Sequence, residues 1–265
     1  IFQNNLKRLS EYEDYIILST GEGEMVCGDF GSGRMLEPKE IFARIKRELS
    51  YEKILKGKRV LVTCGATMED IDPVRFITNH SSGKMGFAIA ETAVSMGAEV
   101  TLIKGNTTAE MPYGLNVINV KSAADMFEAV KANYKNADYI FKAAAVADYT
   151  PKEKALNKIK KADGNLSIEL KRTDDILKFL GENRKEGTKI CGFSMETEDL
   201  IKNSSKKLKS KNVDMIAANS IANKDSGFGT DTNRITIITE NGNKELPLMT
   251  KEECACEIIK TLTEM

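Results

Sequence analysis

The stretch from Lys58 to Gly86, KRVLVTCGATMEDIDPVRFITNHSSGKMG, decides the fold of this chain. Arg59 to Thr63 is a continuous apolar run, which is typical of a strand buried on both faces in a parallel sheet. Apolar residues at helical spacing predict a helix from about Lys84 to Met96, and Gly97 ends it. The long loop between them lies at the carboxyl edge of the sheet, where open α/β folds bind ligands.

The same alternation continues along the chain. Further apolar runs predict strands at Ala98–Ile103, Asp138–Ala145, Lys189–Met195 and Val213–Ala217. Helices are predicted at Ala123–Tyr134 and about Glu198–Lys211, with a hairpin around Asn241-Gly242 and a closing helix from Thr250. The pattern predicts an α/β fold with a doubly wound, mostly parallel Rossmann-like sheet.

One segment interrupts this alternation. Lys158 to Lys171, KIKKADGNLSIELK, contains two short alternating runs joined by Asp163-Gly164, which is a hairpin signal. We expect an inserted β-hairpin arm that reaches toward a ligand or a partner subunit.

Composition divides the chain near residue 56. Residues 1–55 hold a strand-like run, Tyr15–Ser19, a glycine-dense stretch and a helix from about Pro38 to Leu49. This segment is too short to build its own core, so it must dock on something or remain mobile. Residues 56–265 form the second predicted domain.

The overall charge gives no electrostatic argument for nucleic acid or membrane partners, because 39 basic residues balance 39 acidic ones. No apolar run approaches the length of a membrane span. The chain starts without a methionine or a signal-like segment, so we expect a piece of a longer protein.

The cysteine pattern argues against a structural zinc site. The five cysteines form no CxxC pair, and His80 is the only histidine. Cys64, Cys191 and Cys254 lie in apolar runs and are expected to be core residues. This usage fits a reducing cytoplasm.

The loop before the first helix matches neither standard phosphate loop. Its glycines do not have the GxGxxG spacing. A Walker loop would need glycine at position 78 and serine or threonine at position 85, where this chain has Thr78 and Met85. Ser81-Ser82-Gly83 at the helix start nevertheless suits an anion. The alternative is simple N-capping by Ser81 or Ser82, worth about 1 kcal/mol, and the sequence leaves both open.

Two lysine-bearing segments could face such an anion. Asp148 ends the strand of the AAAVADYTPKEKALNKIKK segment, and Lys158, Lys160 and Lys161 follow, with Lys158 and Lys160 on one face of a strand. A charged edge that discourages aggregation is the alternative. Lys207 and Lys211 share one face of the helix near 198–211, where a solvated face is the simpler explanation.

Taken together, these segments resemble the phosphopantothenate–cysteine ligase half of the bacterial bifunctional coenzyme A biosynthesis family. The similarity runs from residue 58 to about 240, in the family's order and spacing. The matching strings are GATMEDIDPVRFITNHSSGKMG, AAAVADY, KIKK, DDIL, GFSMET, and KNVDMIAAN with the downstream phenylalanine and DTN (Asp231–Asn233).

The N-terminal segment VCGDFGSGRM, Val26–Met35, is similar to the tail of the flavin-dependent decarboxylase that precedes the ligase in that family. The resemblance identifies Cys27 with the decarboxylase's proton donor and residues 1–55 with a C-terminal remnant of that domain. FMN would serve only the missing part, so this chain is not expected to decarboxylate.

The resemblance implies a two-step reaction with 4′-phosphopantothenate, CTP and cysteine as substrates. The acid is first activated as an acyl-cytidylate, and cysteine then forms the amide. Asn79 would hold the intermediate, and Lys158 would contact the CTP phosphates. The rest of the nucleotide site would be Asp148, Asp174, Asp175, Ile176, Leu177, Phe193, Lys207 and Lys211. Mg²⁺ is expected to enter with the CTP phosphates, with no protein ligand assigned.

The family ligase is a dimer, and the resemblance makes the Lys158–Lys171 hairpin our candidate for that contact, with a larger assembly when the decarboxylase is present. Two other functions stay open. A Rossmann-type NAD(P)-dependent oxidoreductase lacks support because the chain has no tight glycine turn and no Tyr-x-x-x-Lys pair. A non-catalytic nucleotide-binding module would not require Asn79, Lys158 and the helix lysines together.

Overall fold

The computed structural model describes residues 1–12, 15–24, 30–161, 165–220 and 229–265. It separates into two compact units, Ile1–Leu49 and Ser50–Met265. The boundary lies a few residues before the expected residue 56. The reason is that Leu55 is buried and the hydroxyl of Tyr51 donates to Glu252, so these residues belong to the second unit.

The first unit contains two helices and one hairpin. Its elements are α1 (Phe2–Ser10), β1 (Gly21–Glu24), β2 (Phe30–Arg34) and α2 (Pro38–Ser50), with β1 and β2 antiparallel. The helix expected at Pro38–Leu49 is confirmed. The strand expected at Tyr15–Ser19 is wrong: this run has no ladder partner among the described residues, and Ile16 is 62% exposed. Instead, the two strands within the glycine-dense stretch, β1 and β2, pair with each other.

The second unit is built on one eight-stranded sheet in the order β15-β14-β12-β11-β8-β3-β6-β7. Its parallel strands are β3 (Arg59–Cys64), β6 (Glu99–Lys104), β7 (Asn116–Asn119), β8 (Tyr139–Lys142), β11 (Lys189–Glu196) and β12 (Met215–Ser220). The antiparallel strands β14 (Ile235–Thr239) and β15 (Gly242–Glu245) complete it and confirm the hairpin around Asn241-Gly242. The doubly wound, mostly parallel α/β sheet expected from the sequence is therefore present.

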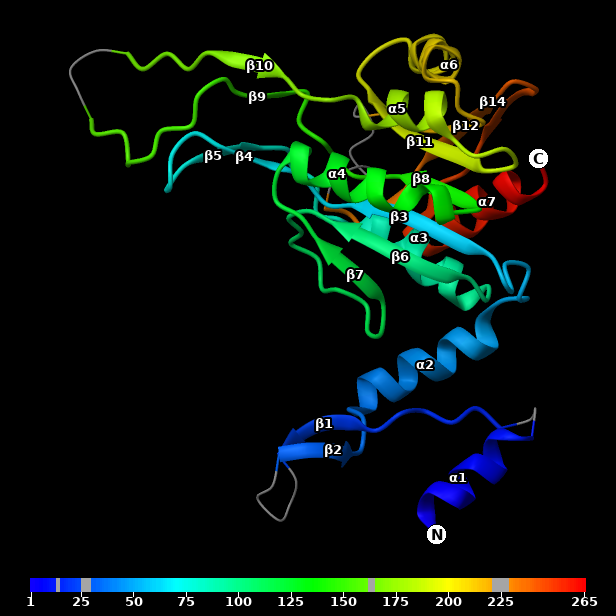
Figure 1. Ribbon diagram of the computed structural model, residues 1–265. Coiled ribbons are helices and arrows are strands. Elements are labelled where there is room, and N and C mark those ends of the chain that lie inside the picture. The colour runs from blue at the N-terminus through cyan, green and yellow to red at the C-terminus, as the bar shows by residue number, and fades with distance from the viewer. Residues whose placement is uncertain (13–14, 25–29, 162–164, 221–228) are drawn as a thin grey trace. The chain divides into compact units, whose positions relative to one another are not determined.

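Helices cover both faces of this sheet (Figure 1). On one side lie α3 (Lys84–Ser95) and α7 (Lys251–Thr263), and on the other α4 (Ala123–Asn133), α5 (Ile176–Asn183) and α6 (Leu200–Lys211). Val60 and Val62 of β3 pack into the first layer, whereas Leu61 packs into the second. Burial of both faces explains why these strands are continuous apolar runs.

Capping residues fix where two of these helices begin. Ser122 and Asp125 form a capping box at α4, and Thr250 and Glu253 form another at α7. The closing helix predicted from Thr250 is thereby confirmed. The short strands β13 (Thr232–Asn233) and β16 (Met249–Thr250) pair just before it.

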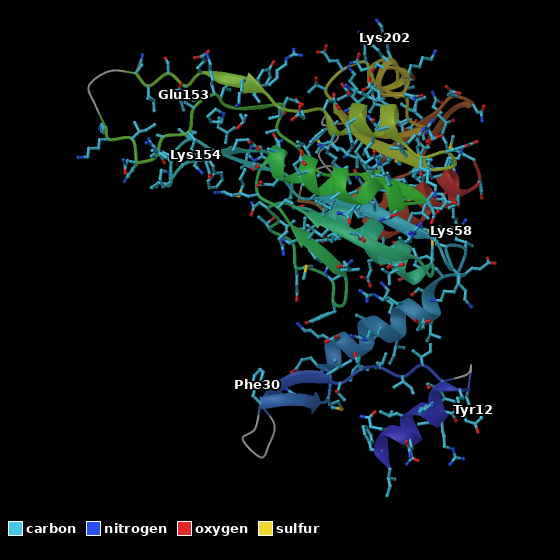
Figure 2. All side chains as sticks on the ribbon, in the orientation of Figure 1. Tyr12, Phe30, Lys58, Glu153, Lys154 and Lys202 are labelled. Carbon is cyan, nitrogen blue, oxygen red and sulfur yellow. The ribbon has the colours of Figure 1, made fainter. Side chains whose placement is uncertain are left out.

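Two hairpins project from the carboxyl edge of the sheet and run alongside each other (Figure 1). One is β4 (Met68–Asp70) with β5 (Phe76–Thr78), and the other is β9 (Tyr149–Pro151) with β10 (Leu170–Arg172). The residues between β9 and β10 form the inserted arm. Lys154 of the arm, which is labelled in Figure 2, pairs with Asp70 of β4.

The arm differs from the expected hairpin in its register. Its ladder joins residues 149–151 to 170–172, and Lys158–Lys161 lie in no strand, so the alternation of Lys158 and Lys160 does not apply. The physical reason is a competing partner. The N–H of Ile159 donates to Asp72 (3.1 Å), and its carbonyl accepts from Arg75 (2.9 Å), so the loop between β4 and β5 takes both groups. The turn Asp163-Gly164 lies outside the described residues.

Among the described helices, none combines the length and apolar character that crossing a membrane would need.

Candidate functional site

The candidate site lies where the direction of strand addition reverses. From β3 the chain continues to β6 and then β7 on one side of the sheet. It then crosses back, and β8, β11 and β12 follow on the other side of β3. The loops that leave β3 and β8 therefore diverge at the carboxyl edge. Such a switch point is where doubly wound sheets form a crevice for ligands.

Two adjoining cavities occupy this crevice. The α3 cavity, about 250 Å³, lies at the start of α3 and is lined among others by Ser81, Ser82, Gly83, Lys84, Asn219, Asn233 and Lys251. The α5 cavity, about 370 Å³, lies at the start of α5 and is lined among others by Arg172, Asp174, Asp175, Ile176, Leu177 and Lys211. The two share five lining residues: Lys142, Val146, Asp148, Phe193 and Lys207.

The α3 cavity has the features of an anion site. The residue that caps α3 is Gly83, with φ of 85°, and neither Ser81 nor Ser82 caps the helix through its side chain. The simple N-capping alternative therefore does not account for the serines. A Cβ at Gly83 would lie 2.5 Å from the side chain of Thr107, so only glycine fits. The start of α3 thus lines the cavity, and its first N–H groups have no capping side chain.

Polar side chains from the far strands complete this cavity. Asn219, at the end of β12, is buried, and its Oδ1 has no hydrogen-bond partner among the described residues. A buried amide oxygen without a partner is costly, and a bound ligand with a donor would satisfy it. Two lysines also line this cavity. Nζ of Lys84 lies 2.6 Å from a carboxylate oxygen of Asp231. Burial lowers the pKa of the other lysine, Lys251.

The α5 cavity is organised by Asp175. Its carboxylate caps α5 by accepting from the N–H of Lys178 (2.9 Å), and it also pairs with Lys211 of α6. Burial is the largest single effect and opposes the ionised form, but the hydrogen bonds from Lys211 and the N–H of Lys178, together with the charges of Lys211 and Lys142, lower the pKa of Asp175. Leu177 and Phe193 supply apolar wall beside these charges. The arrangement places apolar side chains next to cations, which suits a nucleotide.

Two lysines stand on the shared border of the cavities. Lys142 ends β8, and its Nζ donates to the carbonyl of Ala144 (3.1 Å). Lys207 of α6 donates to the carbonyl of Phe193 (3.1 Å). Burial lowers the pKa of both groups, and for Lys142 the value falls to about 8. Cations held in this way favour the approach of an anion.

The structure brings most of the sequence-predicted site residues together. Ser81, Ser82 and Gly83 line the α3 cavity, Asp174, Asp175, Ile176, Leu177 and Lys211 line the α5 cavity, and Asp148, Phe193 and Lys207 line both. Asn79 is exposed, lines neither cavity and donates through Nδ2 to Ala145 at the rim (3.1 Å). Lys158 is exposed on the arm and also lines neither cavity. Cys27 lies outside the described residues.

Sequence reasoning missed several lining residues. Those with charged or amide side chains are Lys84, Lys142, Arg172, Asn219, Asn233 and Lys251. Lys142 carried a usable signal, because it is the one charged residue in the run YIFKAAA. Asn233 lies in the string DTN of the family resemblance, whereas Lys251 gave no signal, since only the fold brings it to the start of α3.

No group of three or more potential metal ligands occurs among the residues that the structure describes. The carboxylates that line the cavities are Asp148, Asp174 and Asp175. Because Asp175 is already paired with Lys211, a divalent cation would depend largely on oxygens brought by the ligand. Cys64, Cys191 and Cys254 are free and buried, as expected for core residues.

Comparison with known proteins points in one direction. A family model described as "DFP: DNA/pantothenate metabolism flavoprotein C-terminal domain" matches residues 55–265. The chain is 46% identical over 259 residues to the coenzyme A biosynthesis bifunctional protein CoaBC of Bacillus subtilis (strain 168), covering 96% of this chain and 64% of that protein. It is 45% identical over 266 residues to a cysteine/cysteine sulfinic acid decarboxylase from an unknown prokaryotic organism, covering 98% and 74%.

Among solved structures, the crystal structure of the C-terminal domain of coenzyme A biosynthesis bifunctional protein CoaBC is similar. It is 47% identical, with a TM-score of 0.67, and the match covers 80% of this chain and 96% of that one. The chain spans less than two thirds of the length of the Bacillus subtilis relative.

Proposed function

Because the chain belongs to the DNA/pantothenate metabolism flavoprotein C-terminal domain family, we propose that residues 50–265 are a CTP-dependent phosphopantothenate–cysteine ligase. The product would be 4′-phosphopantothenoylcysteine, an intermediate of coenzyme A biosynthesis. The name of the Bacillus subtilis relative supports this pathway. Such an enzyme would work in the cytoplasm.

One observation carries the proposal. Two cavities of different character meet at Lys142, Asp148, Phe193 and Lys207. The α5 cavity, with its apolar wall and the Asp175–Lys211 pair, suits a nucleoside triphosphate. The α3 cavity, with the free helix N-terminus, suits a phosphorylated acid. A reaction between the two ligands would take place on their shared border.

The chemistry requires this meeting point. A carboxylate oxygen of 4′-phosphopantothenate attacks the α-phosphorus of CTP, and the bond to the pyrophosphate oxygen breaks. The cysteine amine then attacks the acyl carbon, the bond from that carbon to the phosphate oxygen breaks, and CMP leaves with a proton lost from the amine. Negative charge accumulates on phosphate oxygens in the first step, and fixed cations stabilise it.

We assign the binding of the triphosphate and of the acyl-cytidylate to different residues. Lys207 and Lys211 bind the triphosphate, with Asp175 holding Lys211 in place. Asn79, whose amide lies at the rim of the α3 cavity, would turn toward the acyl-cytidylate. Mg²⁺ would enter with the CTP phosphates and offset their charge when bound.

We also propose that the ligase is a homodimer joined through the arm. Leu156 is 91% exposed and Leu166 57% exposed, and a partner would bury these apolar side chains. Lys158 does not line either cavity, so its contact with CTP phosphates requires the arm to move or the arm of a second copy. In a full-length protein, residues 1–49 would join a flavin-dependent decarboxylase with FMN and Cys27, in a larger assembly.

Pyrophosphate release tests the proposal. Release that requires CTP and 4′-phosphopantothenate together, with amide formed only when cysteine is added, is the expected result. Titration with NADPH tests the oxidoreductase alternative: saturable NADPH binding without any CTP binding would replace our proposal. CTP binding without pyrophosphate release would favour a non-catalytic nucleotide-binding module.

A further inference from the structure

Lys142 occupies a place that none of the sequence motifs explains. It is the last residue of β8, it is half-buried, and it lines both cavities. Its hydrogen bond goes to a neutral main-chain carbonyl, that of Ala144, and no ion pair involves it among the described residues. Its neighbour Lys207 is held in the same way by the carbonyl of Phe193. Carbonyl oxygens satisfy the N–H groups but do not neutralise the two positive charges.

The charges around Lys142 come from three elements. Lys207 and Lys211 face it from α6, Asp175 faces it from the start of α5, and Asp148 faces it from the loop after β8. Asp175 and Asp148 favour the charged form of Lys142, but Asp175 is itself paired with Lys211, and burial and Lys207 outweigh both carboxylates. Burial is the main cause of the lowered pKa of Lys142, about 8, and the charge of Lys207 lowers it further. The free site therefore holds an ammonium close to losing its proton.

We propose that Lys142 is a further phosphate-binding residue of this site, and that it takes up a proton from solvent when a nucleoside triphosphate binds. The inference rests on the proposed function. A polyphosphate bridging Lys142 and Lys207 supplies the negative charge that their carbonyl partners lack. The charged form of Lys142 is then favoured, and the neutral fraction of the free protein captures one proton from the buffer.

Isothermal titration of the full chain with Mg–CTP at pH 8 tests this directly, in two buffers that differ in ionisation enthalpy. The difference in binding heat between the two buffers should correspond to an uptake of about half a proton per site, since about half of the Lys142 side chains are neutral at pH 8. Between pH 8 and pH 9 the Kd of the wild-type chain for CTP should rise about fivefold. This second measurement needs no variant, so it holds even if a substitution disturbs folding.

Two substitutions distinguish the effect of the positive charge of Lys142 on CTP binding from the effect of its change in protonation. Lys142→Arg keeps a permanent charge, so the proton uptake should vanish while the Kd stays within about threefold. Lys142→Met removes the charge and should raise the Kd about 10- to 100-fold. Lys202→Met is the matched control, because Lys202 is exposed on α6 (Figure 2) and should change neither quantity.

The outcomes distinguish this inference from the proposed function. CTP binding with no proton uptake in the wild type, or an uptake that persists in Lys142→Arg, would overturn the role of Lys142 alone. Failure of the wild-type chain to bind CTP in equilibrium dialysis would overturn the proposed function itself.

Discussion

Lys142 illustrates how a site residue weakens the fold that carries it. A half-buried ammonium without a carboxylate partner lowers the free energy of unfolding, because its charged form is less stable in the folded protein than in the unfolded chain. The pKa of Lys142 in the folded protein, about 8, lies below the ordinary lysine value of 10.5. The cost is therefore complete below pH 8 and disappears as the pH rises through 10.5.

Lys142→Met should stabilise the ligand-free protein. At pH 7 the free energy of unfolding is expected to rise by about 1–3 kcal/mol. The upper value is the free energy that corresponds to the full difference between the pKa of Lys142 in the folded and the unfolded chain. The gain should shrink toward zero near pH 10. Urea unfolding of both proteins at the two pH values measures this. A variant that is less stable than the wild type at pH 7 would mean that the Lys142 stem or its bond to Ala144 outweighs the cost of its charge.

Asn79 offers a separate test of the second half-reaction. Its amide nitrogen donates to Ala145 at the cavity rim, and Asn79→Asp replaces that donor with a charge next to carbonyl and phosphate oxygens. Amide formation should fall roughly 100-fold, whereas pyrophosphate release should fall less. Rapid-quench measurement of both products decides the matter. Equal loss in the two assays would argue against a role in holding the intermediate.

Asp72 joins the arm to the hairpin formed by β4 and β5, in addition to the pair between Asp70 and Lys154. Its carboxylate is buried and accepts hydrogen bonds from the N–H groups of Val74 (2.8 Å) and Ile159 (3.1 Å) and from the side chain of Arg75 (2.6 Å). Arg75 is the main cause of a pKa held well below the ordinary range for this carboxyl, against the opposing effect of burial. The anchor is therefore present above the unfolded pKa of about 3.9 and weakens only as the pH falls below it.

Asp72→Asn should release the arm. The amide keeps one acceptor but turns an N–H₂ group toward the donors of Arg75 and Ile159, which are left without partners. Hydrogen exchange of the Ile159 amide is expected to accelerate at least tenfold, with little change in β3 or β8. Glu169→Gln is the control, because its pair with Lys152 is exposed on the same arm. Equal acceleration in both variants would show that Asp72 is not the anchor.

The sequence predicted the regular elements better than the arm. Strands such as β3 and β11 are continuous apolar runs because both of their faces are buried, and that pattern is local. The bonds that place Ile159 join residues more than eighty positions apart, so no local pattern reveals them. The strand expected at Tyr15–Ser19 failed for a similar reason, since an apolar run without a pairing partner forms no ladder.

The same contrast holds for the candidate site. The family resemblance assigned Asp148, Phe193 and Lys207 to one site, and the structure places all three in one crevice at the carboxyl edge of the sheet. Asn219 comes from the end of the parallel strand β12 and was not singled out, whereas Lys251 reaches the crevice only through the start of α7. Asn79 and Lys158 line neither cavity, and their roles stay predictions.

The two units of the chain should be separable in function. Family similarity begins at residue 55, and the compact unit begins at Ser50. A protein shortened to residues 50–265 is expected to form the amide within about twofold of the full chain, because the cavities lie entirely in that unit. A start at Lys58 is the matched control: it removes buried Leu55 and the Tyr51–Glu252 bond and should lower the Tm. Activity lost already at Ser50 would give residues 1–49 a part in the site.

The most direct test of the central claim is a single-turnover reaction with CTP labelled at the α-phosphate and 4′-phosphopantothenate, without cysteine. The account predicts labelled acyl-cytidylate, up to one per site, which disappears into CMP when cysteine is added. In Lys211→Met, which breaks the pair with Asp175, the same yield should require about tenfold more CTP. CTP that remains intact with the acid bound, or amide that forms without a labelled intermediate, would contradict the account.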